Sequence, residues 1–306
     1  MQIEHLTHPY LLKDAARGAV LALGNFDGVH KGHHALLETA KNLAAEQGKP
    51  WGVLTFEPHP RHFFAPQTPP FRITPGNVKL ERLAAHKPDI VVTLPFDEIL
   101  AHLPAKAFIE DVLIAGLGAA HVVVGPDFHF GHLRGGSPQT LEQSSLPTSV
   151  LPYVSAGETK VSSTLVRQLL GEGDIARANE MLGWEWYIEG VVVKGDQRGT
   201  EMGFPTANMR LEHTVHPAYG IYASYVQIEG EAAWRKAATN IGIRPMFEVS
   251  EALVEAHILD FSGDIYGKTI RVKPIKRLRG EEKFADLDAL IKQIAVDCDN
   301  VRSALA

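Results

Sequence analysis

Three glycines and three histidines lie within one short stretch of this sequence, at a junction between an apolar run and a helix-forming run. The stretch GNFDGVHKGHH covers residues 24–34, between AVLAL and ALLETAKNLAAE. Glycines at such a junction permit a tight turn and a close approach of the backbone to a ligand. The helix start adds unpaired N–H groups and the positive end of a dipole. The stretch therefore predicts an anion site, most simply for phosphate.

His30 and His33 lie near the start of this predicted helix, on neighbouring surface. Their imidazoles could ligate a metal ion or contact a phosphate chain. A metal site would require a third protein ligand and supporting carboxylates, and the neighbouring sequence offers no convincing set. Phosphate contact beside the glycine-rich turn is the better interpretation.

A second candidate phosphate site is VSSTLVRQLL, residues 161–170. Ser162, Ser163 and Thr164 are placed to begin a helix, and Arg167 follows one turn later. Hydroxyls, free backbone N–H groups and a guanidinium suit a triphosphate. An ordinary serine cap of a helix is the alternative, and it would be favoured if the stretch stood alone.

A third glycine-rich stretch, KGDQRGTEMGFPTANM, covers residues 194–209 and joins a flexible loop to Pro-Thr-Ala-Asn. It lacks the Gly-Lys-Ser/Thr ending of a Walker loop, and it does not match the dinucleotide fingerprint. Further along, alternation in LVEAHILDF places Glu255 and His257 on one face of a strand. Either side chain could serve chemistry or simply face solvent or the interior.

The elements that must position these residues differ between the two halves of the chain. Short β-rich runs at 19–25, 51–57, 89–95 and 121–125 alternate with helical stretches. This alternation predicts a parallel sheet with helices on both faces, a Rossmann-like α/β domain. Ligands bind beyond the carboxyl ends of strands in such sheets, which is where residues 24–34 fall.

From LGWEWYIEG onward, short β-rich runs are separated by glycines and turn residues with no long helix between them. This pattern predicts a small antiparallel β-barrel domain, so we expect domains at residues 1–183 and 184–306. The chain then ends in an expected helix packed on the barrel, with Cys298 as a buried apolar filler. Its apolar stripe consists of Phe284, Leu287, Ile291, Ile294, Cys298, Val301 and Leu305.

Composition narrows the classes of protein further. A chain of 306 residues suits two domains, and its formal net charge of −6 argues against a general nucleic-acid binder. The single cysteine excludes an intramolecular disulfide and fits a reducing compartment. The N-terminal residues lack the features of a signal peptide, and the most apolar stretch, from Val112, is too short to span a bilayer. We expect a cytoplasmic protein without membrane or nucleic-acid partners, and leave open a homo-oligomer.

GNFDGVHKGHHALL resembles the first signature of the bacterial FAD synthetases, which belong to the nucleotidyltransferase superfamily marked by His-x-Gly-His. TFEPHPRHFF, VGPDFHFGHLRGG and VSSTLVRQLL resemble the same family, in the same order. The resemblance implies that ATP phosphates are held while the phosphate of FMN attacks the α-phosphorus. It implies catalytic roles for His30, His33 and Arg167. It implies ATP or phosphate contacts for Gly24, Asn25, Phe26, Asp27, Gly28, Gly32, Ser162, Ser163 and Thr164.

The same resemblance implies flavin contacts on two loops. Pro58 and His59 follow the predicted strand 51–57, and Asp127 and Phe128 follow the strand 121–125. The prolines of EPHPRH would hold an extended loop, either beside the site or as a rigid surface loop without a ligand. Asp127, like Asn25 and Asp27, could orient flavin or ribose.

The stretch 194–209 resembles the riboflavin kinase signature, as do YGIYA, TNIGIRPMF and VEAHILDFSGDIYG. Such a kinase needs a phosphate cradle, a Mg²⁺ site and a general base. The resemblance implies ATP or flavin contacts for Gly195, Gly199, Gly203, Pro205, Thr206 and Asn208, the last two also reaching Mg²⁺. It implies that Glu255 is the base that deprotonates the 5′-hydroxyl of riboflavin. A solvated strand residue is the alternative for Glu255, and a structural histidine for His257.

Together the blocks span nearly the whole chain in the order of the bacterial bifunctional riboflavin kinase/FAD synthetases. This implies two reactions: riboflavin and ATP give FMN and ADP, and FMN and ATP give FAD and pyrophosphate. Three residues depart from the family pattern: Met246 replaces a usual threonine, His34 a usual glutamine, and Pro126 another residue. Two alternatives remain, namely one catalytic domain with a supporting partner domain, or a flavin-responsive regulator that binds nucleic acid.

Overall fold

The computed structural model describes residues 1–12, 17–157, 159–195, 199, 202–211, 213–246 and 249–306. The chain folds into two compact units. The α/β unit consists of Met1–Pro69 and Thr74–Ser163, and the barrel unit consists of Pro70–Ile73 and Thr164–Ala306. This division falls ahead of residue 183, because nearly all of helix α7 (Ser163–Glu172) and the whole of α8 (Ile175–Leu182) belong to the barrel unit. The domain boundary at residue 183 stays a prediction.

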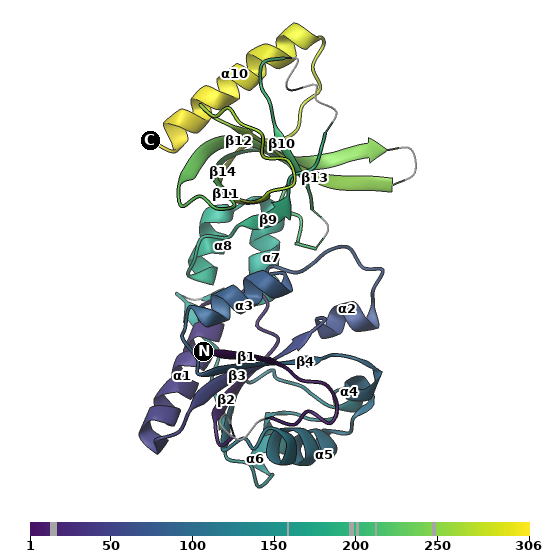
Figure 1. Cartoon of the computed structure of the whole chain (residues 1–306), viewed down its shortest axis with the longest axis vertical. Helices are drawn as coiled ribbons and strands as arrows, with labels where there is room; N and C mark the ends of the chain where they lie inside the picture. The colour runs from purple at the N-terminus through teal and green to yellow at the C-terminus, as the bar shows by residue number, and fades with distance from the viewer. Residues whose placement is uncertain (13–16, 158, 196–198, 200–201, 212, 247–248) are drawn as a thin grey trace. The chain divides into compact units, whose positions relative to one another are not determined.

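A six-stranded sheet in the order β1-β4-β3-β2-β5-β6 forms the centre of the α/β unit (Figure 1). Every pair of neighbouring strands is parallel, as the alternating sequence pattern predicted. The strands are β1 (Gln2–His5), β2 (Val20–Leu23), β3 (Trp51–Glu57), β4 (Ile90–Pro95), β5 (His121–Val124) and β6 (Thr148–Val150). The edge strands β1 and β6 were not expected, because their short segments lack a long apolar run.

Helices cover both faces of this sheet. The main helices are α1 (Lys31–Gln47), α2 (Pro60–Phe64), α3 (Gly76–Ala84), α4 (Glu98–His102), α5 (Ala105–Ala107) and α6 (Pro138–Glu142), with a π-helical segment at Phe108–Gly116. Alternate residues of β2 enter different hydrophobic cores: Val20 packs with α1, and Leu21 packs with the Phe108–Gly116 segment. Burial on both faces explains why the four central strands, β2 to β5, are mostly apolar. A two-stranded ribbon, β7 (Ser155–Ala156) and β8 (Thr159–Lys160), follows β6.

The barrel unit contains a six-stranded antiparallel sheet in the order β10-β13-β12-β11-β14-β9. Its strands are β9 (Ile188–Val191), β10 (Ala207–Arg210), β11 (Gly220–Ile228), β12 (Trp234–Met246), β13 (Val249–Ile258) and β14 (Thr269–Arg279). A bridge between Val193 and Asn208 connects the two ends of the sheet, which nearly closes the barrel. The predicted antiparallel β-domain is confirmed. Asn208, which follows the glycine-rich loop, lies on strand β10.

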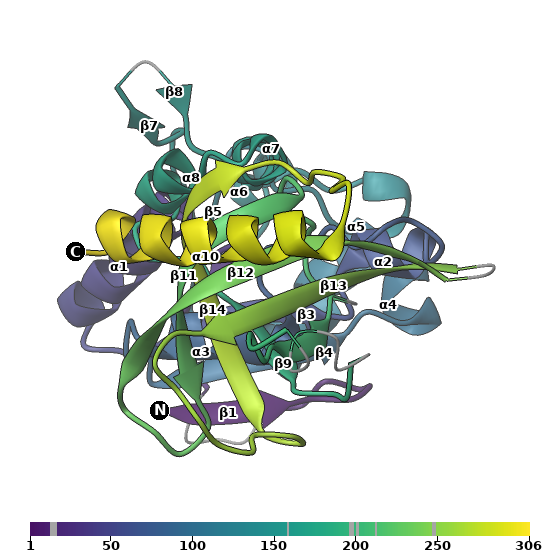
Figure 2. The same cartoon turned by 90° about the horizontal axis from the view of Figure 1, so that it is seen from above.

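The C-terminal helix α10 (Leu287–Ala304) lies against β11, β12 and β14 (Figure 2). The predicted stripe is packed in its second half, where Cys298, Val301 and Leu305 are buried against the barrel. The first half differs from the prediction: Asp286 caps the helix, so Phe284 precedes it, and Leu287 is 58% exposed. Leu290 and Ile294 line a cavity, and Ile294 also packs against the core around Cys298 and Val301.

Candidate active sites

The predicted anion turn connects β2 to α1 at the carboxyl edge of the parallel sheet. Gly28 has a φ of 87°, and the non-glycine residues Phe26 and Val29 also adopt positive φ values of 52° and 39°. Both of those side chains are completely buried in the core under α1, which compensates for the strained backbone. Gly24 is required for a different reason, since a Cβ there would lie 3.3 Å from the Phe26 ring. The turn is thus fixed by packing as well as by glycine.

Asp27 stabilises the turn through hydrogen bonds to Thr74. Its Oδ1 accepts hydrogen bonds from the backbone N (3.1 Å) and the Oγ1 (3.3 Å) of Thr74, and the Gly28 N–H donates to the same hydroxyl at 2.9 Å. Asp27 is 2% exposed and Thr74 is fully buried. These bonds direct the Asp27 carboxylate toward Thr74. Its predicted contact with ATP stays a prediction.

His30 and His33 cap helix α1 reciprocally. The His30 Nδ1 accepts from the His33 backbone N–H, and the His33 Nδ1 accepts from the His30 backbone N–H, each at 3.3 Å. Their rings stack with centroids 3.6 Å apart. Burial lowers the pKa of His30 to about 4, and burial followed by the His30 charge lowers the pKa of His33 well below its usual value. Both imidazoles are therefore neutral at pH 7.

The cap also fixes the tautomer of both rings. A neutral imidazole whose Nδ1 accepts a hydrogen bond carries its proton on Nε2. His30 and His33 therefore each carry one Nε2–H donor near the N-terminal end of α1, where the helix dipole is positive. Two such donors suit a phosphate chain, whereas a metal ion would bind an unprotonated nitrogen. Among the described residues, no group of three or more His, Cys, Asp or Glu side chains is arranged to hold a metal.

The predicted serine block reaches this turn. The Ser163 Oγ donates to the Asp27 carbonyl at 2.8 Å, and a Cβ at Gly32 would lie 3.7 Å from the Val161 carbonyl. The segment that ends in Ser162 and Ser163 thus lies beside the start of α1. Thr164 and Arg167 belong to the barrel unit, where the Arg167 Nε donates to the Phe71 carbonyl at 2.7 Å. The phosphate contacts of these four residues stay predictions.

The two candidate flavin loops follow β3 and β5, the strands on either side of β2. Parallel strands end at one edge, so His59 and Asp127 lie on loops that leave the same edge as the histidine turn. His59 caps α2 through its Nδ1, which accepts from the Arg61 N–H at 3.1 Å. Pro58 precedes it. Phe128 stacks on Phe130 with centroids 5.6 Å apart. The sheet order supports a shared site for these loops, but their flavin contacts stay predictions.

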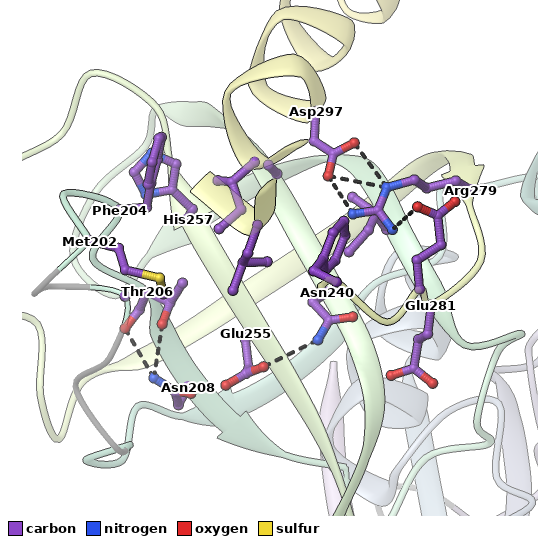
Figure 3. Close-up of a pocket in the computed structure, with 17 residues that line it drawn as sticks. Met202, Phe204, Thr206, Asn208, Asn240, Glu255, His257, Arg279, Glu281 and Asp297 are labelled. Carbon is purple, nitrogen blue, oxygen red and sulfur yellow. Dashed lines mark hydrogen bonds and ion pairs between the residues drawn. The ribbon is translucent and has the colours of Figure 1, made fainter. Parts of the chain in front are cut away.

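The barrel unit contains a cavity of about 460 Å³ (Figure 3). Strand register places Asn208 opposite Glu255 and Asn240 opposite Glu255, so the three side chains form one row across β10, β13 and β12. The Asn240 Nδ2 donates to the Glu255 Oε2 at 3.2 Å. The cavity is lined by Gly199, Met202, Phe204, Thr206, Asn208, Ile221, Ala238, Asn240, Glu255, His257, Arg279, Glu281, Glu282, Phe284, Leu290, Ile294 and Asp297.

The glycine-rich loop lies against one end of this row. A Cβ at Gly195 would lie 2.7 Å from the Asn208 Cγ, and one at Gly199 would lie 2.5 Å from the Phe204 carbonyl oxygen. The Asn208 Nδ2 donates to the Thr206 Oγ1 at 3.3 Å and to its carbonyl at 3.1 Å. Gly203 has a φ of 85°. Glycine is thus needed both for close approach and for a turn. Residues 196–198 and 200–201 of this loop lie outside the described residues.

His257 has a structural partner in the same loop. Its Nδ1 is 2.8 Å from the Pro205 carbonyl oxygen, and its ring makes an edge contact with Phe204. This geometry supports the structural interpretation of His257. The neutral oxygens of Thr206 and Asn208 are ligands that suit Mg²⁺, whose remaining ligands would be water and nucleotide phosphates.

The opposite end of the cavity is formed by residues that sequence reasoning missed. Arg279 on β14 donates from Nε and Nη2 to the carboxylate of Asp297 on α10, at 2.7–3.2 Å. The hydrogen bond to Asp297 raises the pKa of Arg279 further. Phe284, Leu290 and Ile294 supply an apolar wall beside this pair. No sequence signal connects Arg279 with Asp297, because the contact exists only once α10 packs on the barrel.

The chain thus has a parallel α/β sheet with a histidine-capped turn in one unit and an antiparallel barrel with a row of polar side chains around a carboxylate in the other. The class of protein, a transferase that acts on flavins with ATP, follows from the comparison with known families. Two family models match the chain: FAD synthetase over residues 12–165 and riboflavin kinase over residues 182–305. The chain belongs to the family of bifunctional riboflavin kinase/FMN adenylyltransferases.

Relatives of this family match along almost their entire length. The bifunctional riboflavin kinase/FMN adenylyltransferase of Bacillus subtilis (strain 168) is 35% identical, over 97% of this chain and 96% of the relative. The Escherichia coli (strain K12) protein of the same description is 40% identical, over 92% of this chain and 90% of the relative. A Streptococcus pneumoniae crystal structure, described as a macrolide-efflux protein, has a TM-score of 0.88 at 30% identity and covers 99% of both chains.

The words macrolide efflux describe the Streptococcus pneumoniae protein and are not carried over to this chain. In the part of this chain that the structure describes, no helix has both the length and the apolar character needed to cross a membrane.

Proposed function

We propose that the two activities of this family are divided between the two units, with riboflavin phosphorylated in the barrel cavity and FMN adenylylated at the histidine-capped turn. The row of Asn208, Glu255 and Asn240 is the observation that carries the first assignment. In this row the Glu255 carboxylate lies between Asn240, whose amide donates to it, and Asn208, whose oxygen suits a Mg²⁺ ion bound to phosphate. A metabolite-binding regulator would have no need for a carboxylate in this position.

In the kinase step, Glu255 accepts the proton of the 5′-hydroxyl of riboflavin while that oxygen forms a bond to the γ-phosphorus of ATP. The bond from the γ-phosphorus to the bridging oxygen breaks, and ADP leaves. Thr206 and Asn208 would hold Mg²⁺, which would neutralise phosphate charge there. The loop containing Gly195, Gly199 and Gly203 lies beside these two residues, as a phosphate cradle requires. Pro205 ends that loop.

The shape of the cavity supports one orientation of riboflavin. Glu255 marks the end where the ribityl hydroxyl must lie. The apolar wall of Phe284, Leu290 and Ile294 supplies a surface for the flat isoalloxazine ring.

In the adenylylation step, a phosphate oxygen of FMN attacks the α-phosphorus of ATP, and pyrophosphate leaves. The Nε2–H groups of His30 and His33 donate to phosphate oxygens and stabilise the charge that develops on them. Gly24, Gly28 and Gly32 allow the nucleotide to approach the backbone, as do the neighbouring Asn25, Phe26 and Asp27. Ser162, Ser163, Thr164 and Arg167 contribute further phosphate contacts, and Pro58, His59, Asp127 and Phe128 contact the flavin.

The expected setting is the cytoplasm, without nucleic-acid or membrane partners. Cys298 is a free, buried thiol, which supports a reducing compartment. The described residues of each candidate site belong to one chain, so the assignment requires no particular oligomeric state and is compatible with a homo-oligomer. Light scattering coupled to size-exclusion chromatography would measure that state.

The assignment predicts that the chain converts riboflavin to FAD when ATP and Mg²⁺ are supplied. Chromatographic separation of the flavins should show FMN first and FAD later, because the FMN made by phosphorylation is the substrate of adenylylation. Chelation of the divalent cation with EDTA should stop both steps, and excess Mg²⁺ should restore them, since both act on magnesium-bound phosphates. Accumulation of FMN without FAD would restrict catalysis to the barrel unit. Bound riboflavin with no product would favour the regulator.

Asn240→Ala should slow FMN formation about tenfold, because it removes a hydrogen bond of about 1.5 kcal/mol to a charged group. The effect should fall on kcat more than on the KM for riboflavin, since Asn240 orients Glu255. Asn240→Asp should be slower still, because it places a second negative charge beside that carboxylate. Steady-state kinetics of both steps would check this. An unchanged kcat in a folded Asn240→Ala variant would exclude the orienting role.

A further inference from the structure

A lysine with no exposed surface lies beneath the carboxyl edge of the parallel sheet. The Lys79 side chain, on α3, is 0% exposed. Its Nζ donates to the Thr55 Oγ1 at 3.0 Å and the Phe56 carbonyl at 2.9 Å, and pairs with the Glu57 Oε1 at 2.6 Å. Burying an ammonium group is costly unless it is paired and hydrogen-bonded, and here three oxygens surround it. The burial of this lysine therefore requires an explanation, which a solvent-exposed lysine would not.

The partners of Lys79 lie at the end of β3, next to the loop that follows this strand and to the turn that follows β2. The Thr55 Oγ1 accepts from Lys79 and donates onward to the Asn25 carbonyl at 3.3 Å, so it connects the ammonium to the histidine turn. Glu57 is the last residue of β3 and immediately precedes Pro58 and His59. One buried group therefore contacts the end of β3 and, through one hydroxyl, the turn after β2.

The segment that contains Lys79 supports the turn at a second point. Thr74, just before α3, bonds the Asp27 carboxylate and the Gly28 N–H. The positive charge of Lys79 also acts on His33, whose pKa is lowered first by burial, then by His30 and His34, and also by Lys79. These are the titratable groups that act on His33: His30 from the cap of α1, His34 from α1 itself and Lys79 from α3.

We propose that Lys79 is a positioning residue for adenylylation, whose buried ammonium holds the turn after β2 and the loop after β3 in a single arrangement around His33. This proposal rests on the assignment of adenylylation to the α/β unit. Lys79 touches neither substrate in this role. It acts by fixing Asn25 and Glu57, and by keeping the His33 imidazole neutral so that its Nδ1 can accept the His30 N–H and hold the ring in place.

The test compares Lys79→Met with Lys106→Met in the full-length chain. Lys106 is the matched control, since it also lies near a glutamate (Glu110, 3.8 Å) in the same unit but is 83% exposed. We expect Lys79→Met to lower kcat/KM for FMN adenylylation at least tenfold. We expect Lys106→Met to leave it unchanged. Riboflavin phosphorylation, measured on the same samples, should be unchanged in both and reports that the barrel unit is folded.

A structural role alone would not move the pH profile, which is the decisive readout. Removing the Lys79 charge removes one cause of the low pKa of His33, so that pKa should rise. The acid side of the adenylylation profile should then move to higher pH, and the NMR titration of the His33 ring nitrogens should move with it. A folded Lys79→Met variant with the original rate and profile would overturn the proposal.

Thr55→Val provides a second test of the positioning role of Lys79 if the Lys79→Met variant does not fold. This change preserves the shape of residue 55 and the charge of Lys79, and removes only the hydroxyl that connects it to Asn25. Adenylylation should slow several-fold with riboflavin phosphorylation unchanged, and an unchanged rate would refute the positioning role. His33→Ala tests separately whether adenylylation takes place at the histidine turn. Full adenylylation activity in a folded His33→Ala variant would contradict that assignment.

Discussion

Glu255→Gln is expected to abolish the conversion of riboflavin to FMN and to leave the conversion of FMN to FAD nearly intact. Glutamine preserves the shape of the side chain but cannot take the proton of the 5′-hydroxyl. Loss of a positioned general base typically costs about 10²–10⁴-fold in rate. Most of the residues assigned to adenylylation lie in the α/β unit, and Thr164 and Arg167, which lie in the barrel unit, are not part of the row formed by Asn208, Glu255 and Asn240.

Chromatography of the flavin products measures both steps in one variant, with riboflavin as the substrate in one reaction and FMN in the other. Glu185→Gln is the matched control, because Glu185 pairs with Lys273 at 2.6 Å and is 59% exposed. It should leave FMN formation unchanged. If Glu255→Gln retained substantial kinase activity, the interpretation of Glu255 as a solvated strand residue would be the correct one.

His33→Ala is expected to have the opposite effect, with adenylylation strongly reduced and FMN formation retained. The variant loses one Nε2–H donor, and removal of one such donor typically costs about 10²–10³-fold in kcat. It also loses the bond that His33 accepts from the His30 N–H. The cost of a lost helix cap is about 1 kcal/mol, which a domain of this size tolerates.

The rate of FAD formation from FMN and ATP measures this effect, and thermal unfolding shows whether the variant is folded. His102→Ala is a suitable control in the same unit, since His102 is 64% exposed and pairs with Glu98 on its own helix. It should adenylylate FMN normally. The two-site assignment would be wrong if a folded Glu255→Gln or His33→Ala chain lost both steps.

The sequence determined the fold class, because the signals for it are local. Apolar runs such as residues 51–57 alternate with helical stretches, and that period alone requires a parallel sheet with two covered faces. The change to short runs with glycine turns predicted the barrel. It did not predict β1 and β6, which are edge strands whose pairing comes from their neighbours.

The sequence also indicated which residue types carry the chemistry. Its motifs included Glu255, Thr206, Asn208, His30 and His33 among the candidates. It could not place Asn208, Glu255 and Asn240 in one row, because strand register depends on pairing between segments far apart in the chain. Nor did it show that the two histidines cap one another. That bond fixes their tautomer and depends on the geometry of one helix end.

Lys79 marks the limit of the sequence most clearly. In NVKLERLAAH it has the appearance of a solvated residue on an amphipathic helix, as most lysines are. Only the packing of α3 beneath the end of β3 surrounds its ammonium with three oxygens. Burial of a charge is decided by which surfaces meet, and the tertiary structure alone brings those surfaces together.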